Sequence, residues 1–443
     1  MSHLTFKDCV VDFNGKIYGS GIIEENSDWR FVVFDIRKQA FIKRFSPDDI
    51  HYDLKLIFDE SSLLTLAKKQ AVEGLRELDI MSKRIKAYYQ AASVADVDES
   101  VGLDEIVPEE DIEAYTKARV DVLRQLWEKV SDDQLQYYEK KVWPLFCDIM
   151  KIEQSQIHID EKLLQFFLKR NDLAVHETKF LKHIAGCTKD SFAKTKISPV
   201  GSKTWRMKVE GGLQCMSIPH GVCRQVINSR FDFGHIITLD FNAIDYRCLV
   251  KAVNDEKLND YYMDRRDFHS ATAGALPTIN TDMRTLAKNL TYTHIYGGSI
   301  ETLQKMTKLP QSTIQRLITV LDELFDPITK FRNKLATEAR KAGFLYTPDG
   351  HKVEISSDDH DGKIVGLYAQ TYSSSVMNEA VYVALLYLER LRSKLIFTVH
   401  DELAFDVHPD EVNDVMTICN AIELKTKYAV KFKLGDNYDQ ATK

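Results

Sequence analysis

The sequence contains no long hydrophobic run. No stretch approaches roughly eighteen uninterrupted apolar residues, the length from which a segment is taken as a candidate membrane-spanning helix. The first residues, MSHLTFKDCV, also lack the basic segment followed by an apolar one that marks a secretory leader. We therefore expect no membrane partner and a cytoplasmic location, which is the host cytoplasm if the source is a virus.

Cysteine is sparse and scattered. The seven cysteines are Cys9, Cys147, Cys187, Cys215, Cys223, Cys248 and Cys419. No two of them form a C-x-x-C pair, the spacing that typically marks a structural zinc site or a redox motif. A disulfide framework is not expected from such spacing, and buried free thiols are the simpler interpretation.

The chain also lacks an overall excess of positive charge. Its formal net charge of −7 argues, taken alone, against a polyanionic partner. The distribution is uneven, however: residues 96–115 contain nine acids and no Lys or Arg, whereas residues 162–208 contain eleven Lys or Arg and three acids. The basic stretch is either a solvated surface or a surface that contacts phosphates, and charge alone leaves both open.

Length and composition indicate a globular protein of several domains. The 443 residues are 44% hydrophobic and 28% charged, which is ordinary for a folded chain. WRFVVFDI and KQAFIKRF near the start are strand-like, and helical periodicity follows over residues 61–92. We predict a small N-terminal α/β domain over 1–95 and an acidic linker over 96–116, where Gly102 and Pro108 interrupt regular structure.

Two adjacent acids interrupt an apolar hairpin near the C-terminus. FTVHDELAFDV, at 397–407, places Asp401 and Glu402 between apolar strands. Neighbouring side chains of a strand point to opposite faces, so both acids cannot bind one ion unless a tight turn intervenes. The apolar run HIITLDF supplies a partner in Asp240, and paired carboxylates suit Mg²⁺. The alternative is a pair of strand ends with solvated acids.

A second pattern repeats every four residues. Arg284, Lys288, Tyr292 and Tyr296 would form a slowly spiralling stripe along one side of a helix. Cations followed by aromatic rings suit a nucleotide, because the charges meet phosphates and the rings meet sugar and base. An amphipathic helix with incidental cations is the alternative, and it explains the tyrosines less well.

Three segments resemble motifs of family A DNA polymerases, the DNA polymerase I type, and they occur in that family's order. DFNAIDYR at 240–247 resembles D-Y-S-x-I-E-L-R, the 284–297 stripe resembles R-x3-K-x3-F/Y-x3-Y-G, and VHDE at 399–402 is similar to the family's V-H-D-E. Shorter matches are TWR at 204–206, which resembles T-G-R, DFHSATA at 267–273 and LGDNYDQA at 434–441. PDGHKV at 348–353 resembles the polymerases of short-tailed phages.

The resemblance implies an α+β fold shaped like a right hand. Thumb, palm with an antiparallel sheet, and helical fingers would be joined to the small N-terminal α/β domain. The thumb would comprise residues 117–206, the palm 207–248 and 366–443, and the fingers 249–365. The implied activity is template-directed, DNA-dependent DNA synthesis, in which dNTPs are added to a primer 3′-hydroxyl by two-metal phosphoryl transfer.

The same resemblance implies the catalytic residues. Asp240 and Asp401, with the backbone carbonyl of Phe241, would hold two Mg²⁺ ions, for which Mn²⁺ is a possible substitute. Lys288 would neutralise the α-phosphate, and Glu402 would act close to the metals without being an obligate ligand.

Nucleotide and DNA contacts are implied in the same way. The nucleotide set is Arg284, His269, Tyr292, Tyr296 and Asp245, and the primer–template set is Arg206, Gln370 and His400. Asp245 stands where the family usually has Glu, the residue associated with blocking a ribose 2′-hydroxyl. Because aspartate is one methylene shorter, we expect weaker but real discrimination against ribonucleotides.

The N-terminal domain lies where relatives carry a 3′–5′ exonuclease, whose chemistry needs Asp-x-Glu on a strand. The strand candidates contain Asp12 and Asp35 without the second acid, and Asp111-x-Glu113 falls in the acidic linker. We therefore expect no proofreading, and a processivity factor or a separate exonuclease as possible partners.

Two other functions remain open. A single-subunit RNA polymerase shares the hand, but His400-Asp401-Glu402 differs from the H-D-S such enzymes have. A catalytically retired polymerase fold that only binds nucleic acid is disfavoured because Asp240, Asp401, Lys288 and Arg284 are all present.

Overall fold

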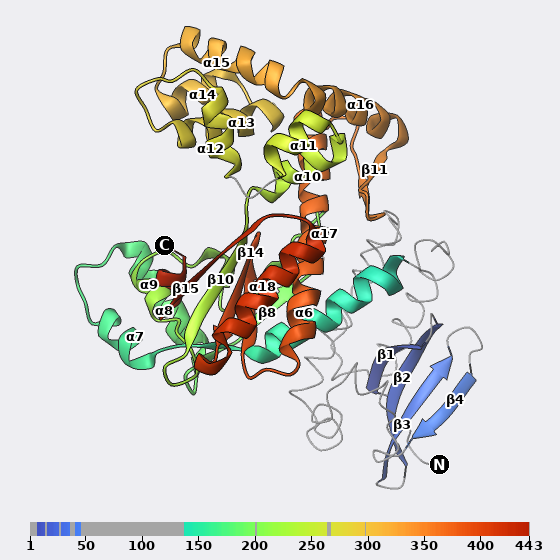
Figure 1. Cartoon of the computed structure of the whole chain (residues 1–443). Coiled ribbons are helices and arrows are strands. Elements are labelled where there is room, and N and C mark those ends of the chain that lie inside the picture. Colours follow the sequence, from blue (N-terminus) through green and yellow to red (C-terminus); the bar gives the residue numbers. More distant parts are fainter. Residues whose placement is uncertain are drawn as a thin grey trace. The chain divides into compact units, whose positions relative to one another are not determined.

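The computed structural model shows two compact units, Met1–Cys147 and Asp148–Lys443 (Figure 1). The residues it describes are 7–13, 16–25, 28–35, 40–45, 137–199, 202–263, 267–296 and 298–442. No helix within these ranges has the length and apolar character needed to cross a membrane.

The described part of the first unit is mostly an antiparallel four-stranded sheet of order β1-β2-β3-β4. Its strands are β1 (Lys7–Phe13), β2 (Lys16–Glu25), β3 (Asp28–Asp35) and β4 (Ala40–Phe45). The predicted strand character of this region is confirmed, with Asp12 in β1 and Asp35 ending β3. The predicted helix over 61–92 and the acidic linker over 96–116 lie outside the described residues. A short π-helix, η2 (Tyr138–Val142), precedes the second unit.

A second antiparallel sheet, of order β13-β14-β10-β15, carries the candidate site. Its strands are β10 (His235–Phe241), β13 (Lys394–Val399), β14 (Glu402–Val407) and β15 (Val430–Gly435). Consecutive residues of β10, β13 and β14 are buried, because elements pack against both faces of the sheet. This explains why these strands are continuously apolar rather than alternating.

Two helices cover one side of this sheet. The long helix α17 (Asp361–Leu388) contacts β13 and continues into the helical region, while α18 (Val412–Thr426) packs against α17 and β15 (Figure 1). The 3₁₀ turn η4 (Pro409–Glu411) leads into α18. More than half of the residues of α17 are buried, because this helix packs against both the sheet and the helical region.

The helical region packs around one aromatic core. Its elements are α10 (Ile244–Val253), α11 (Glu256–Tyr262), α12 (Phe268–Ala275), α13 (Met283–Tyr296), α14 (Ile300–Thr307), α15 (Gln311–Leu324), α16 (Asp326–Ala342) and the hairpin β11 (Phe344–Tyr346)–β12 (Lys352–Glu354). Phe268 stacks between Tyr246 and Tyr262, with ring centroids 4.9 and 4.3 Å away. These contacts hold α12 against α10 and so fix the residues next to Phe268.

Smaller elements complete the described chain, and several of them form a second core together with β10, β13 and β14. They are α6 (Trp143–Ser155), β5 (Ile157–His158), α7 (Glu161–Leu168), α8 (Val175–Cys187), β6 (Thr188–Lys189), β7 (Phe192–Ala193), β8 (Thr195–Ser198), β9 (Lys208–Gly212), η3 (Cys215–Ser217), α9 (Val222–Gln225) and α19 (Tyr438–Ala441). The cysteines with described side chains carry free thiols, and all but Cys187 are buried. This confirms the thiol prediction for that part of the chain.

Candidate active site

The acid pair lies at one end of the second sheet. Asp240 is the next-to-last residue of β10, and Asp401 lies in the two-residue turn that joins Val399 of β13 to Glu402 of β14. Asp240 stands opposite Glu402 in the β10–β14 register, and the amide of Phe241 donates a hydrogen bond to the Asp401 carbonyl at 3.1 Å. The strand pairing therefore gathers all three carboxylates at the same edge.

The turn changes one step of the sequence interpretation. Asp401 lies in the turn and not in a strand, so strand alternation does not separate it from Glu402. His400 has a φ of 53°, the left-handed conformation that a tight hairpin turn needs and that usually favours glycine. A non-glycine residue pays about 1–2 kcal/mol there, a strain that points to a constraint on this turn.

Charge repulsion marks the site as one that suits a cation. Burial and the neighbouring Asp401 and Glu402 raise the pKa of Asp240 to about 7, against the opposing effect of Lys431. Burial and Asp245 raise the pKa of Asp401 as well, while Arg206 and His400 oppose that shift. Although protein atoms crowd the Asp240 carboxyl and reduce its solvation, the residue keeps an exposed surface, so an ion can reach it.

Glu402 has a partner of its own. The hydroxyl of Tyr438, in α19, donates a hydrogen bond to the Glu402 carboxylate at 2.8 Å, and the guanidinium of Arg224 lies 4.7 Å from the Tyr438 ring. The acid is thereby held by α19, and two acids remain without such an anchor. This arrangement agrees with a supporting rather than an obligate role.

The donor chemistry fits Mg²⁺. Within the described ranges, no group of three or more His, Cys, Asp or Glu residues is placed to hold a metal ion. Magnesium usually binds one or two protein carboxylates and completes its shell with water and substrate phosphates. Asp240 and Asp401 meet that requirement, whereas zinc would need more nitrogen or sulfur ligands.

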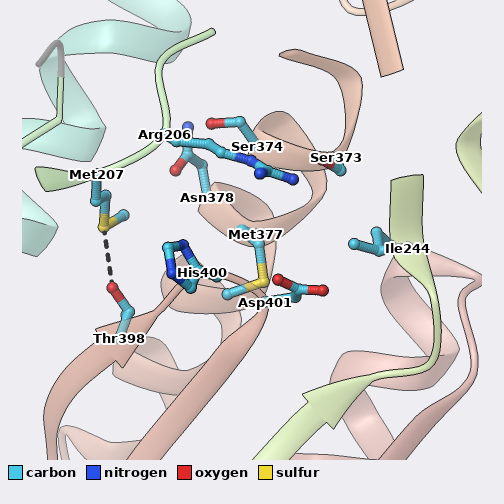
Figure 2. A pocket seen from close by; sticks show the side chains of 10 residues that line it. All are labelled: Arg206, Met207, Ile244, Ser373, Ser374, Met377, Asn378, Thr398, His400 and Asp401. Carbon is cyan, nitrogen blue, oxygen red and sulfur yellow. Dashed lines mark hydrogen bonds between the residues drawn. The ribbon is translucent and has the colours of Figure 1, made fainter. Parts of the chain in front are cut away.

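Asp401 and Arg206 line one pocket (Figure 2), and Arg206 forms an ion pair with Asp245, another predicted site residue. The lining residues are Arg206, Met207, Ile244, Ser373, Ser374, Met377, Asn378, Thr398, His400 and Asp401. Nη2 of Arg206 donates to both carboxylate oxygens of Asp245, at 2.7 and 2.9 Å, and the Ser373 hydroxyl donates to Oδ1 at 2.5 Å. Arg206, predicted to contact the primer, is therefore engaged with Asp245, predicted to face the sugar.

Trp205 fixes the backbone before Arg206. Its φ of 54° is left-handed, which explains why the family pattern has glycine at this position. The Ser374 hydroxyl donates to the Trp205 carbonyl at 2.6 Å, and the indole packs edge-to-face on His351 of the β11–β12 turn, with centroids 4.5 Å apart. Because these contacts offset the strain, the larger residue is tolerated.

Helix α13 carries the whole predicted stripe. Arg284 at its start binds the Asp267 carboxylate through Nε and Nη2, at 3.0 and 2.9 Å, and Lys288 is exposed one turn later. His269 is 6% exposed, and burial lowers its pKa to about 4, helped by Arg284 and Lys288 and opposed by Asp267. Near neutral pH the imidazole is therefore uncharged, and the cations are the arginine and the lysine.

The two tyrosines of the stripe differ in exposure. Tyr292 is 40% exposed and its ring lies 4.9 Å from that of Tyr246. Tyr296 packs on Gly366 of α17, where a Cβ atom would approach the ring to 3.3 Å, and its buried hydroxyl has no hydrogen-bond partner among the described residues. Tyr292 is thus the ring that a ligand can contact, whereas Gly366, which lacks a Cβ atom, leaves room for the ring of Tyr296.

Three contacts of the site escaped the sequence interpretation. Ser373 lies one turn after Gln370 on α17, and its hydroxyl also lies 3.0 Å from the Gln370 carbonyl. The sequence singles out Asp267 only as the first residue of DFHSATA. It does not single out Lys431 of β15, whose ammonium lies 3.3 Å from the Asp267 carboxylate. No local spacing signals these residues, because each acts across long distances in sequence.

Arg247 ties the strand that carries Asp240 to the helical region, and its loss is expected to destabilise the fold. It is 1% exposed; Nε donates to the Asn242 carbonyl at 2.6 Å, and Nη1 donates to the Tyr262 carbonyl. Arg247→Met keeps the volume but leaves buried carbonyls unsatisfied, so we expect a loss of about 2–3 kcal/mol in unfolding free energy.

Urea denaturation measures this loss. The matched control is Arg316→Met, at an exposed position of α15. It is expected to change the unfolding free energy by less than about 0.5 kcal/mol. Equal stability of the two variants would contradict the proposed role of Arg247.

The fold is that of a right-hand polymerase domain. The structure is similar, with a TM-score of 0.72 and 14% sequence identity, to the "POL domain of Pol1 from M. smegmatis complex with DNA primer-template and dNTP", covering 94% of each chain. Residues 148–440 match the sequence model of DNA polymerase family A. The chain belongs to DNA polymerase family A, and the predicted α+β right-hand fold is confirmed.

Two curated relatives are DNA polymerases by name. A DNA polymerase of Mycobacterium phage D29 is 25% identical over 227 residues, covering 49% of this chain and 36% of the relative. DNA polymerase I of Treponema pallidum is 24% identical over 307 residues, covering 63% and 30%. The matched region therefore spans about a third of the length of these relatives.

Proposed function

We propose that the protein is a template-directed DNA polymerase that adds dNTPs to a primer 3′-hydroxyl. Membership of family A supports this, as does the neighbour whose title includes primer–template and dNTP. The observation that carries the proposal is the placement of Asp240 and Asp401 at one sheet edge, with Asp245 and Tyr292 of α13 close enough to interact electrostatically with Asp401.

Asp240 and Asp401, with the Phe241 carbonyl, would hold the two Mg²⁺ ions, and Mn²⁺ is a possible substitute. Bound there, the ions would supply charge stabilisation and lower the pKa of the primer hydroxyl. Glu402 supports this edge of the site from its anchor on Tyr438. The repulsion between the acids keeps the site attractive to a cation.

The triphosphate is held by the α13 cations. Arg284 meets the outer phosphates together with neutral His269, which can donate a hydrogen bond without adding charge, and Lys288 neutralises the α-phosphate. Tyr292 offers an exposed ring for the nucleotide, while Tyr296 and Asp245 shape the space around the sugar. These side chains hold and orient the nucleotide before reaction.

The primer terminus would be contacted by Arg206, Gln370 and His400. Minor-groove acceptors are similar in all base pairs, so these contacts read correct geometry rather than sequence. Primer–template DNA and dNTPs are thus the proposed partners, together with a processivity factor or a separate exonuclease. We place the reaction in the cytoplasm, the host's if the source is viral, and without proofreading.

Primer extension tests the proposal. With purified protein, a labelled primer on four templates that differ in the first unpaired base should incorporate only the complementary dNTP. Extension should require Mg²⁺, persist with Mn²⁺ and stop with a chelator. Binding of primer–template without extension would favour a retired polymerase fold, and equal use of rNTPs and dNTPs would favour an RNA polymerase.

A further inference from the structure

A lysine of the sheet reaches the cluster that is assigned to the triphosphate. Lys431, in β15, stands opposite Asp240 in the β10–β15 register. Its ammonium lies 3.3 Å from Oδ2 of Asp267, the carboxylate that also binds Arg284. The Lys431 side chain therefore links β15, the strand beside Asp240, to Asp267, the residue that caps the start of α12.

Three cations gather near an uncharged His269. Arg284 and Lys431 both bind the Asp267 carboxylate, and Lys288 is close enough to His269 to help lower its pKa. Two further carboxylates lie at the ends of this group, Asp282 beside Arg284 and Asp240 opposite Lys431. The Lys431 side chain is 51% exposed and that of Asp267 is 17% exposed, so a solvent-accessible cation is held by a largely covered acid. An exposed ion pair contributes about 0–1 kcal/mol, too little to hold this ammonium against a more highly charged ligand.

We propose that Lys431 is a further triphosphate-binding residue, which contacts the phosphates from the sheet side while Arg284 and Lys288 contact them from α13. Asp267 acts as an internal anion that occupies two of these cations until the phosphates replace it. A triphosphate carries several negative charges against the single charge of Asp267, so the exchange is electrostatically favourable. The inference rests on the proposed nucleotide binding at this site.

A purely structural role makes a different prediction. If Lys431 serves only to tie β15 to α12 through Asp267, removing either side chain breaks the same contact. Both variants should then change dATP binding equally. If Lys431 binds phosphate, removing the lysine weakens nucleotide binding, whereas neutralising Asp267 frees the cations and does not weaken it. Asp267→Asn keeps the helix cap of α12, because asparagine accepts the Ser270 amide as well as aspartate does.

The experiment measures dATP binding without chemistry. Calorimetric titration uses the full chain with Mg²⁺ and a primer–template in which thymine is the next template base. The primer ends in a dideoxynucleotide, so dATP can bind but cannot be incorporated. Lys431→Met is expected to raise the dissociation constant about tenfold, the effect of one charge-assisted hydrogen bond, and Lys431→Arg to restore most of the affinity. Lys433→Met, two residues along the same strand and opposite Thr238, is the matched control and is expected to bind as the unmodified chain does.

The outcomes separate this inference from the proposed activity. Unchanged dATP affinity in Lys431→Met, with normal primer extension, overturns the inference alone. Equal weakening by Lys431→Met and Asp267→Asn also overturns it in favour of a tether. Lys431-dependent binding in a chain that extends no primer supports the inference and contradicts the polymerase proposal.

Discussion

Replacing Asp401 by asparagine is expected to reduce primer extension by about a thousandfold or more. The carboxylate lies in the tight β13–β14 turn beside the Asp240 strand end, where it would hold the catalytic cations. Loss of charge stabilisation worth about 4 kcal/mol corresponds to a thousandfold in rate. Single-turnover extension with Mg²⁺ and one dNTP measures this rate.

Two further measurements keep the result specific to catalysis. Asparagine has nearly the same shape and removes one of several repelling charges, so the unfolding free energy in metal-free buffer should not fall. Primer–template affinity should be equal or higher for the same reason. Asp232→Asn, at an exposed position in the turn before β10, is the matched control, and extension comparable to it by the Asp401 variant would refute the assignment.

The acids and the α13 stripe could be predicted because each depends on local pattern. HIITLDF is a buried strand whose next-to-last residue is an acid, and the four-residue spacing after Arg284 places the side chains on one side if the segment is helical. The exact position of Asp401 could not be derived in the same way. Whether it lies in a strand or in a turn depends on the β13–β14 register, which hydrophobic pattern alone does not fix.

The remaining contacts depend on tertiary structure. Asp245 receives Arg206 from 39 residues before it and Ser373 from 128 residues after it, and neither separation leaves a periodic signal. Lys431 and Asp267 are 164 residues apart, so their contact leaves no periodic signal either. A sequence indicates which side chains can carry the chemistry, whereas the packing of α17 and β15 decides which of them meet.

The second large effect concerns the sugar. Asp245→Ala is expected to lower the preference for dNTP over rNTP by roughly tenfold to a hundredfold, because it removes the carboxylate proposed to exclude a 2′-hydroxyl. Arg206 and Ser373 hold both oxygens of this carboxylate, which partly compensates for its being shorter than glutamate. The measurement is the ratio of kcat/KM values for dCTP and CTP opposite template guanine.

The ion pair makes this prediction sharper, because Arg206 is also assigned to the primer. When the guanidinium turns to the DNA, Ser373 remains as the contact that positions Asp245, so Ser373→Ala should lower the same ratio about threefold to tenfold while dCTP is still used. Ser375→Ala, on the same helix as Ser373, loses a hydrogen bond to Asp349 of the β11–β12 turn; it is the control and should leave the ratio unchanged. If Asp245→Ala kept full sugar preference, the exclusion would have to come from the rings of Tyr292 and Tyr296, and the Arg206–Asp245 pair would serve only to hold the Arg206 loop against α10.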